Sequence, residues 1–324
     1  MSSPSLGLLK TLITEVVSSM SAPNNGDMDE AAVSSSEAIS QRLGLVIDQK
    51  GRQVEIVLFD PQRITQGLAT LPREPDPKDD KLSWGYDYWS DDAWDKVREG
   101  VVGVITISPP REGWCDKDTL NIDSVAAQPG YGPFMYDVAM SVIYPRFLTA
   151  DRDSVTKSAL AIWNYYLTSR SDVGKVLMKS VLKGECPIPH VSSPSVKRIN
   201  SLQQQLETKE RHLDNIKHLG RRPQSQRPPY WNDAKIKGDL EKIEGAIEKI
   251  NTELQKLYTT FPMAWKFRIK KPLGVKRLMA NADKFLQQGN LLIPPAAKRA
   301  FKLTRKTILG AGEGYFQEKY RGNG

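Results

Sequence analysis

A short glycine turn, set between an expected strand and an expected helix, is the stretch whose residue types best suit ligand chemistry. Residues 120–127 are rich in β-branched and small apolar side chains, which is typical of a strand. Gly130, Tyr131 and Gly132 follow, and a helix is expected over 133–143. Glycines let backbone amides approach an anion, and a helix start carries partial positive charge. The spacing suits a phosphate-binding turn, and a glycine needed only for backbone conformation is the alternative.

The strand, turn and helix resemble the acyl-CoA pyrophosphate loop of the GNAT superfamily of N-acyltransferases. The turn of that family reads Gln/Arg-x-x-Gly-x-Gly/Ala. This sequence keeps Gly130 and Gly132 but has Ala127 at the first position, with Gln128 one residue later. The resemblance implies that acyl-CoA is the cofactor, held by Gln128, Gly130, Tyr131 and Gly132.

The resemblance also implies an acid for the reaction. In this family a tyrosine on a later helix often protonates the departing thiolate, and the stretch 161–166, which ends in Tyr165 and Tyr166, is similar to that element. Either tyrosine is a candidate, and a packed aromatic pair is the alternative interpretation. No acidic residue stands out as the base for an amine substrate, and Asp123 is the nearest candidate.

A longer pattern resembles uncharacterised acyltransferase-like domains encoded by tailed bacteriophages. It covers roughly residues 100 to 175 and runs from the glycine turn through Asp151-Arg152 to Trp163 and the paired tyrosines. It implies a phage-encoded protein that transfers an acyl group from acyl-CoA to an amine, in the host cytoplasm or in the virion. The alternative is a non-catalytic virion component that uses the fold as a scaffold, because fold does not fix function.

The elements around the turn predict the fold class α+β. We expect strands at 43–47, 54–59, 101–107 and 120–127 and helices at 133–143 and 154–168. This pattern predicts a GNAT-like mixed sheet with helices, followed by a helical hairpin and a basic helical tail. The expected parts are an N-terminal helical arm and linker at 1–32, the acyltransferase-like domain at 33–190, the hairpin at 191–260 and the tail at 261–324.

Heptad spacing predicts the hairpin. Apolar residues recur at a and d positions over 199–216 and again over 236–257, and the proline-rich segment 220–233 between them ends both helices. We therefore expect an antiparallel coiled coil whose tip presents cations beside aromatic side chains, a combination suited to nucleic acid. The cations of the tip are Arg221, Arg222 and Arg227.

Charge is divided unequally along the chain. Residues 1–194 hold 19 basic and 26 acidic side chains, a net charge of −7, whereas residues 195–324 hold 27 and 12, a net charge of +15. A basic surface attracts phosphate polymers or acidic proteins, so we expect one of these partners, with a solvated surface as the alternative. The cations expected to contact it in the tail are Lys298, Arg299, Lys302, Arg305 and Lys306.

Composition excludes several classes of protein. Hydrophobic residues make up 39% of the chain, which is enough for a packed core. Cys115 and Cys186 have no Cys-x-x-Cys spacing and only three histidines accompany them, so neither a disulfide framework nor a zinc site is supported, and we expect a reducing compartment. No run of about 20 apolar residues is present, so we expect no membrane span.

Overall fold

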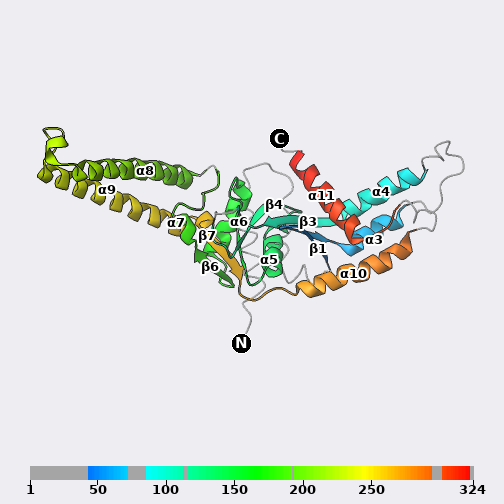
Figure 1. Ribbon diagram of the computed structural model, residues 1–324. Helices are drawn as coiled ribbons and strands as arrows, with labels where there is room; N and C mark the ends of the chain where they lie inside the picture. Colours follow the sequence, from blue (N-terminus) through cyan, green and yellow to red (C-terminus); the bar gives the residue numbers. More distant parts are fainter. Residues whose placement is uncertain (1–42, 72–84, 112–114, 192, 294–300, 322–324) are drawn as a thin grey trace, which may run out of the picture.

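The structure, a computed structural model, describes residues 43–71, 85–111, 115–191, 193–293 and 301–321. The fold is α+β, with a seven-stranded mixed sheet at its centre and a long helical hairpin that projects from one end (Figure 1). The expected N-terminal arm lies outside the described residues. The strands are β1 (Gly44–Lys50), β2 (Gln53–Phe59), β3 (Val101–Ser108), β4 (Thr119–Ala127), β5 (Phe147–Thr149), β6 (Val173–Leu177) and β7 (Trp265–Ile269). The helices are α3 (Pro61–Ala69), α4 (Gly85–Glu99), α5 (Gly132–Val142), α6 (Lys157–Thr168), α7 (Lys179–Leu182), α8 (Pro194–Arg221), α9 (Asp233–Thr260), α10 (Val275–Leu292) and α11 (Arg305–Arg321).

The sheet has the order β1-β2-β3-β4-β5-β7-β6. Its first four strands are antiparallel neighbours, and Gly51 supplies the left-handed φ of 64° that closes the turn from β1 to β2. β4 and β5 are parallel, joined by a crossover through α5, and they pair only over Thr119–Asn121 and Phe147–Thr149. β7 lies between β5 and β6 and is antiparallel to both.

Helices cover both faces of the first strands. Val46, Val57 and Val104 are cross-strand partners that belong to the cluster formed with α3, α4 and α11. Two glycines show how closely the layers pack. A Cβ added at Gly103 would lie 2.7 Å from Met135 Sδ of α5, and one at Gly312 of α11 would lie 2.6 Å from Val57 Cγ2.

The segment 261–324 was expected to be a basic helical tail, and the structure corrects this. It contributes β7 to the interior of the sheet, α10 packs along the edge strand β1, and α11 packs on β2 and β3. Asn281 of α10 donates a hydrogen bond to the Leu43 carbonyl, at 3.1 Å. The expectation failed because the many Lys and Arg residues lie on outward faces, while alternate apolar residues face the core.

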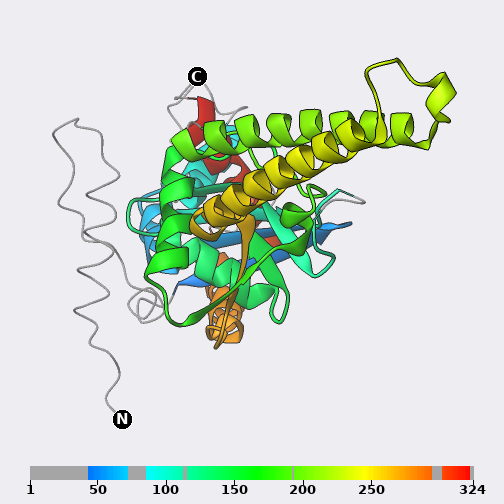
Figure 2. The ribbon, with the colours of Figure 1, turned by 90° about the vertical axis from the view of Figure 1, so that its left-hand side faces the viewer.

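The helices α8 and α9 lie side by side as an antiparallel hairpin (Figure 1 and Figure 2). Contacts between the arms fix the direction, because Arg198 bonds to Glu253 near the base whereas Lys217 pairs with Glu244 towards the tip. Val196, Ile199 and Leu202 at the base join the main core. The hairpin is not an appended unit, since α9 leads directly into β7, and it forms an insertion between the paired strands β6 and β7.

A disulfide joins Cys115 to Cys186, although the sequence supported no disulfide framework. Cys115 lies in the connection from β3 to β4, and Cys186 follows α7, 71 residues further along the chain. The neighbouring Asp116 also contacts α7, because its Oδ1 accepts a hydrogen bond of 2.8 Å from Ser180 Oγ.

We predict that Phe267→Ala lowers the free energy of unfolding by about 3–5 kcal/mol, because Phe267 is fully buried against Trp163 on α6. Lys271→Ala, at an exposed position two residues after β7, should change it by less than about 0.5 kcal/mol. Denaturation in urea measures both values. Equal effects of the two substitutions would contradict a strand inside the sheet.

Candidate functional site

The glycine turn lies where β4 ends and α5 begins. Gln128 fixes its first residue, because its backbone amide donates to the Val102 carbonyl at 2.8 Å and its side-chain amide donates to the Val101 carbonyl at 2.6 Å. Gly130 has a φ of 83°, a conformation that favours glycine. At Gly132 an added Cβ would meet only Ile162 Cδ1 in the described part, at an ordinary contact distance of 3.5 Å. The turn therefore requires Gly130 for its backbone conformation, whereas Gly132 leaves space beside the turn.

The N-terminus of α5 has no side-chain cap. Tyr131 occupies the N-cap position without a capping hydrogen bond from its side chain, and Pro133 has no amide hydrogen. The Met135 amide is the first to bond back into the helix, to the Tyr131 carbonyl at 3.0 Å. The amides of Gly132 and Phe134 precede that bond and point out of the helix end. Such amides, together with the helix dipole, can hold an anionic group.

β4 extends beyond its short pairing with β5 before it reaches the turn. The pairing of β4 with β5 stops at Asn121, and β4 continues to Ala127. Asp123 lies in this extension at an irregularity in the register with β3, and its carboxylate accepts a hydrogen bond of 2.7 Å from Ser108 Oγ. Burial of the carboxyl raises the pKa of Asp123, and its hydrogen bonds from Ser108 and Gln53 oppose this shift. Its position four residues before the end of β4 is about 13 Å from the turn along the strand.

Neither tyrosine proposed as the acid reaches the surface. Tyr166 is fully buried, and its hydroxyl lies 2.7 Å from Asp137 Oδ1 and 2.8 Å from the Pro133 carbonyl oxygen. Tyr165 is also buried, and the Arg170 guanidinium lies 5.9 Å from its ring centre. Both residues pack in the core, as the alternative interpretation of the aromatic pair predicted.

Tyr166 belongs to a buried polar network that joins α5 and α6. Arg170 pairs with Asp137 at 3.1 Å and forms two hydrogen bonds of 2.7 Å to Asp172. Burial raises the pKa of Asp137, although Arg170 and Tyr166 favour its charged form, and burial raises the pKa of Tyr166 well above its usual value. A buried network of this kind stabilises one packing arrangement, so its role is structural.

We predict that Tyr166→Phe lowers the free energy of unfolding by about 1–3 kcal/mol, because the buried Asp137 carboxylate loses a hydrogen-bond donor. Tyr230→Phe serves as the control, since Tyr230 is exposed at the hairpin tip and its hydroxyl has no hydrogen-bond partner among the described residues. Chemical denaturation measures the difference. Unchanged stability combined with a lost acyl-transfer activity would instead identify Tyr166 as the catalytic acid.

Arg152, three residues after β5, is a buried cation without an ion pair in the described part of the chain. Its Nη1 donates to the Met263 carbonyl at 2.8 Å, whereas its Nε has no hydrogen-bond partner there. The neighbouring Asp151 carboxylate accepts bonds from the amides of Asp153 and Ser154. Burial lowers the pKa of Arg152 to about 10. The charge therefore costs folding free energy.

We predict that Arg152→Met stabilises the protein by about 1–4 kcal/mol, because a flexible apolar side chain replaces a buried and incompletely bonded charge. The midpoint of urea denaturation should rise. Arg146→Met, at an exposed position, is the matched control and should leave the midpoint unchanged. A large loss of stability in Arg152→Met would show that the guanidinium bonds are favourable on balance.

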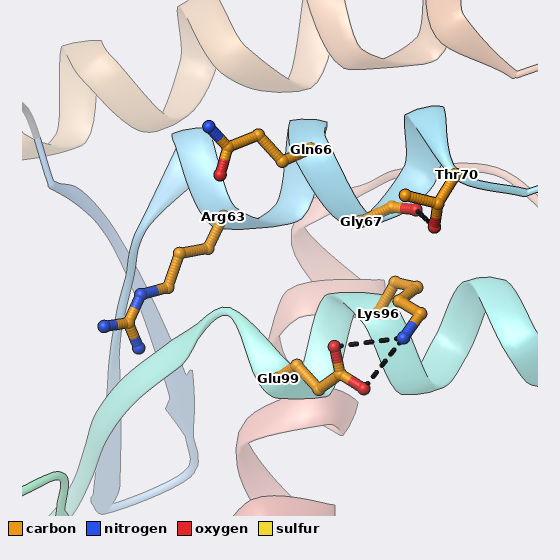
Figure 3. A pocket seen from close by; sticks show the side chains of 6 residues that line it. All are labelled: Arg63, Gln66, Gly67, Thr70, Lys96 and Glu99. Carbon is orange, nitrogen blue, oxygen red and sulfur yellow. Dashed lines mark hydrogen bonds and ion pairs between the residues drawn. The ribbon is translucent and has the colours of Figure 1, made fainter.

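A polar hollow of about 430 Å³ lies between α3 and α4, close to the turn. Figure 3 shows Lys96 and Glu99 paired on one side of it, at 3.0 Å, while Arg63 extends away from this pair. Arg63 Nη1 donates to Gln128 Oε1 at 2.9 Å, so α3 places a guanidinium beside the glycine turn. Sequence reasoning missed Arg63, because no local pattern connects residues that are 65 positions apart.

The cations expected to bind nucleic acid do not form one surface. Arg221 and Arg222 lie at the hairpin tip, whereas Lys302, Arg305 and Lys306 lie at or just before the start of α11, which packs on β2 and β3, away from the end of the sheet from which the hairpin projects (Figure 1). Arg305 is bonded to Asp283 of α10. Lys298 and Arg299 lie outside the described residues.

Arg227 was expected to contact nucleic acid, but the structure gives it a structural role. Its side chain is only 9% exposed, and it donates to the carbonyls of Arg222 and Gly220 at 2.7 and 2.8 Å. It also pairs with Asp233 at the start of α9. The guanidinium therefore caps the end of α8 and joins it to α9, which leaves it no face for a phosphate.

Other kinds of site find no support in the described residues. No group of three or more His, Cys, Asp or Glu side chains there is arranged to hold a metal ion. None of the described helices has the length and apolar character needed to cross a membrane. No family model, curated protein or solved structure matches this chain.

Proposed function

We propose that this chain is a GNAT-like protein, encoded by a tailed bacteriophage, that binds acyl-CoA at the glycine turn. The uncapped N-terminus of α5, at the glycine turn that follows the end of β4, is the observation that carries the proposal. The amides of Gly132 and Phe134 would contact the pyrophosphate. Arg63, held by Gln128, adds the positive charge that Ala127 does not supply at the first position of the family turn.

Acyl-CoA would supply a thioester whose carbonyl an amine can attack. The residues of this chain explain how the cofactor could be bound better than they explain how a proton could be transferred. Tyr165 and Tyr166 are buried, and Asp123 lies well along the strand from the turn. In this proposal the turn binds and orients the cofactor, the stretch of β4 beyond its pairing with β5 receives its acyl arm, and the acceptor is an amine.

A second candidate function is a non-catalytic virion component. The burial of both tyrosines favours it, because a family acid sealed in the core cannot protonate a leaving thiolate. The hairpin also favours it, since two helices of 28 residues each, inserted between β6 and β7, offer a long surface for assembly. The location proposed for either function is the host cytoplasm or the virion. The disulfide between Cys115 and Cys186 fits the virion better.

We predict that Gly132→Glu abolishes CoA binding, because its carboxylate would lie where the pyrophosphate is expected. Gly132 does not have a left-handed φ, and a carboxylate in the first turn of a helix stabilises it, so the variant should fold. Isothermal titration of the full chain with CoA and acetyl-CoA measures the affinity.

Gly132→Gln is the matched control, since it has the same size without the charge, and it should retain measurable binding. Wild-type protein that shows neither heat nor a thermal shift with millimolar CoA would refute the proposed function. Equal losses in the Glu and Gln variants would assign the effect to size and not to charge.

A further inference from the structure

The outward face of β7 and the segment that follows it carry a strip of cations away from the glycine turn. Along β7 and the residue that follows it, Trp265, Phe267 and Ile269 alternate with Lys266, Arg268 and Lys270. Phe267 and Ile269 are buried in the main core, so the basic side chains occupy the opposite face. The basic strip, as we name it, consists of Arg146, Arg268, Lys270, Lys271, Lys276 and Arg277.

Two members of the basic strip are held in place by neighbouring groups. The Arg268 guanidinium lies 4.6 Å from the centre of the Phe147 ring, and its Nη1 donates to the Pro145 carbonyl at 3.0 Å. Lys270 Nζ donates to the Ser171 carbonyl at 2.7 Å. Each side chain keeps further N–H donors for a ligand. Because these cations are already ordered, a bound anion would cost less side-chain entropy.

Carboxylates neutralise little of the basic strip in the described part of the chain, where Asp172 attracts Lys270. Residues 261–282 contain six Lys or Arg and no Asp or Glu. In the described part, Arg146, Lys271, Lys276 and Arg277 form no ion pair, and the neighbouring Asp172 is engaged by Arg170. Lys266, on the same face of β7, is instead nearly buried and paired with Asp116 and Asp118. The positive charge is thus concentrated on the exposed members of the strip.

An exposed aromatic ring adjoins these cations. Tyr144 is 46% exposed, and it precedes the Pro145 carbonyl that holds Arg268. Surfaces that bind single-stranded nucleic acid combine cations that follow the backbone with aromatic rings on which bases stack. Arg268 and Lys270 are two residues apart on a strand, which separates them by about 6.6 Å and suits an extended charged backbone.

We propose that the basic strip and Tyr144 bind single-stranded nucleic acid, with contacts mainly to phosphates and little sequence preference. An acidic peptide would not need the exposed ring. The surface adjoins the beginning of β5, whereas the glycine turn follows the end of β4, and these two strands are parallel. The two ligands would therefore bind at opposite ends of the strands, and this proposal does not depend on the proposed function.

The test uses the full chain and a fluorescently labelled 20-nucleotide oligothymidylate, with binding measured by fluorescence anisotropy between 50 and 200 mM salt. The test variant is Lys271→Glu/Lys276→Glu/Arg277→Glu. The matched control, Lys237→Glu/Lys242→Glu/Lys249→Glu, makes the same change of net charge on exposed positions of α9. Thermal melting confirms that both variants fold.

The test variant should bind at least tenfold more weakly than wild type at 50 mM salt, and the control should stay within about twofold. The slope of log affinity against log salt should become shallower by about 2 in the test variant, because three phosphate contacts are lost. Tyr144→Ala, which leaves the charge unchanged, should weaken binding by about tenfold through lost stacking.

Three outcomes would overturn the proposal. Wild-type protein that does not bind the oligonucleotide at 50 mM salt would refute it directly. Equal weakening by the two triple variants would show that total charge, not the basic strip, determines binding. The third outcome is that polyglutamate or duplex DNA binds as tightly as the oligonucleotide and that Tyr144→Ala does not change binding. The ligand of the basic strip would then be a polyanion other than single-stranded nucleic acid.

Discussion

The insertion of β7 between β5 and β6 is the constraint on which the rest of the structure depends. β7 pairs with β6 over five residues and meets β5 at Leu148 and Phe267, so one short strand holds the two parts of the sheet together. The same strand places Phe267 against Trp163 of α6. It also anchors the end of α9, which enters β7 through a single turn of 3₁₀ helix at Pro262–Ala264. The hairpin, the sheet and the core beneath α6 are thus built around one strand.

The buried polar groups of this region are satisfied to different degrees. Arg170 has two carboxylate partners and ties α5 to the segment between α6 and β6, so its burial is compensated. Arg152 has no carboxylate partner in the described part and one nitrogen without a hydrogen bond. A protein that retains a costly group normally uses it, or has not been selected for maximal stability. Arg152 lies just beyond β5, where β4 continues towards the glycine turn.

Local sequence patterns predicted the strands and helices well, whereas contacts between residues far apart in the chain could not be predicted. The apolar runs at 54–59 and 101–107 became β2 and β3, and the stretch after the glycine turn became α5, because such elements follow from residues near one another. β7 was missed because its basic side chains were interpreted as part of a basic helical tail. Cys115 and Cys186 are 71 residues apart, and Arg63 and Gln128 are 65 apart, so neither contact has a signal in one sequence. Arg227 was misjudged since its role depends on the geometry of the loop around it.

The hairpin also affects the order in which the chain can fold during synthesis. Eighty-seven residues separate the end of β6 from the start of β7. Until β7 leaves the ribosome, β5 and β6 present edges without the strand that joins them, and such edges promote aggregation. The antiparallel arms of α8 and α9 counteract this delay, because a hairpin that forms locally brings its two ends together. It thereby reduces the entropy lost when the nascent chain closes the sheet. The insertion thus shortens the effective loop between β6 and β7 while the chain is still being made.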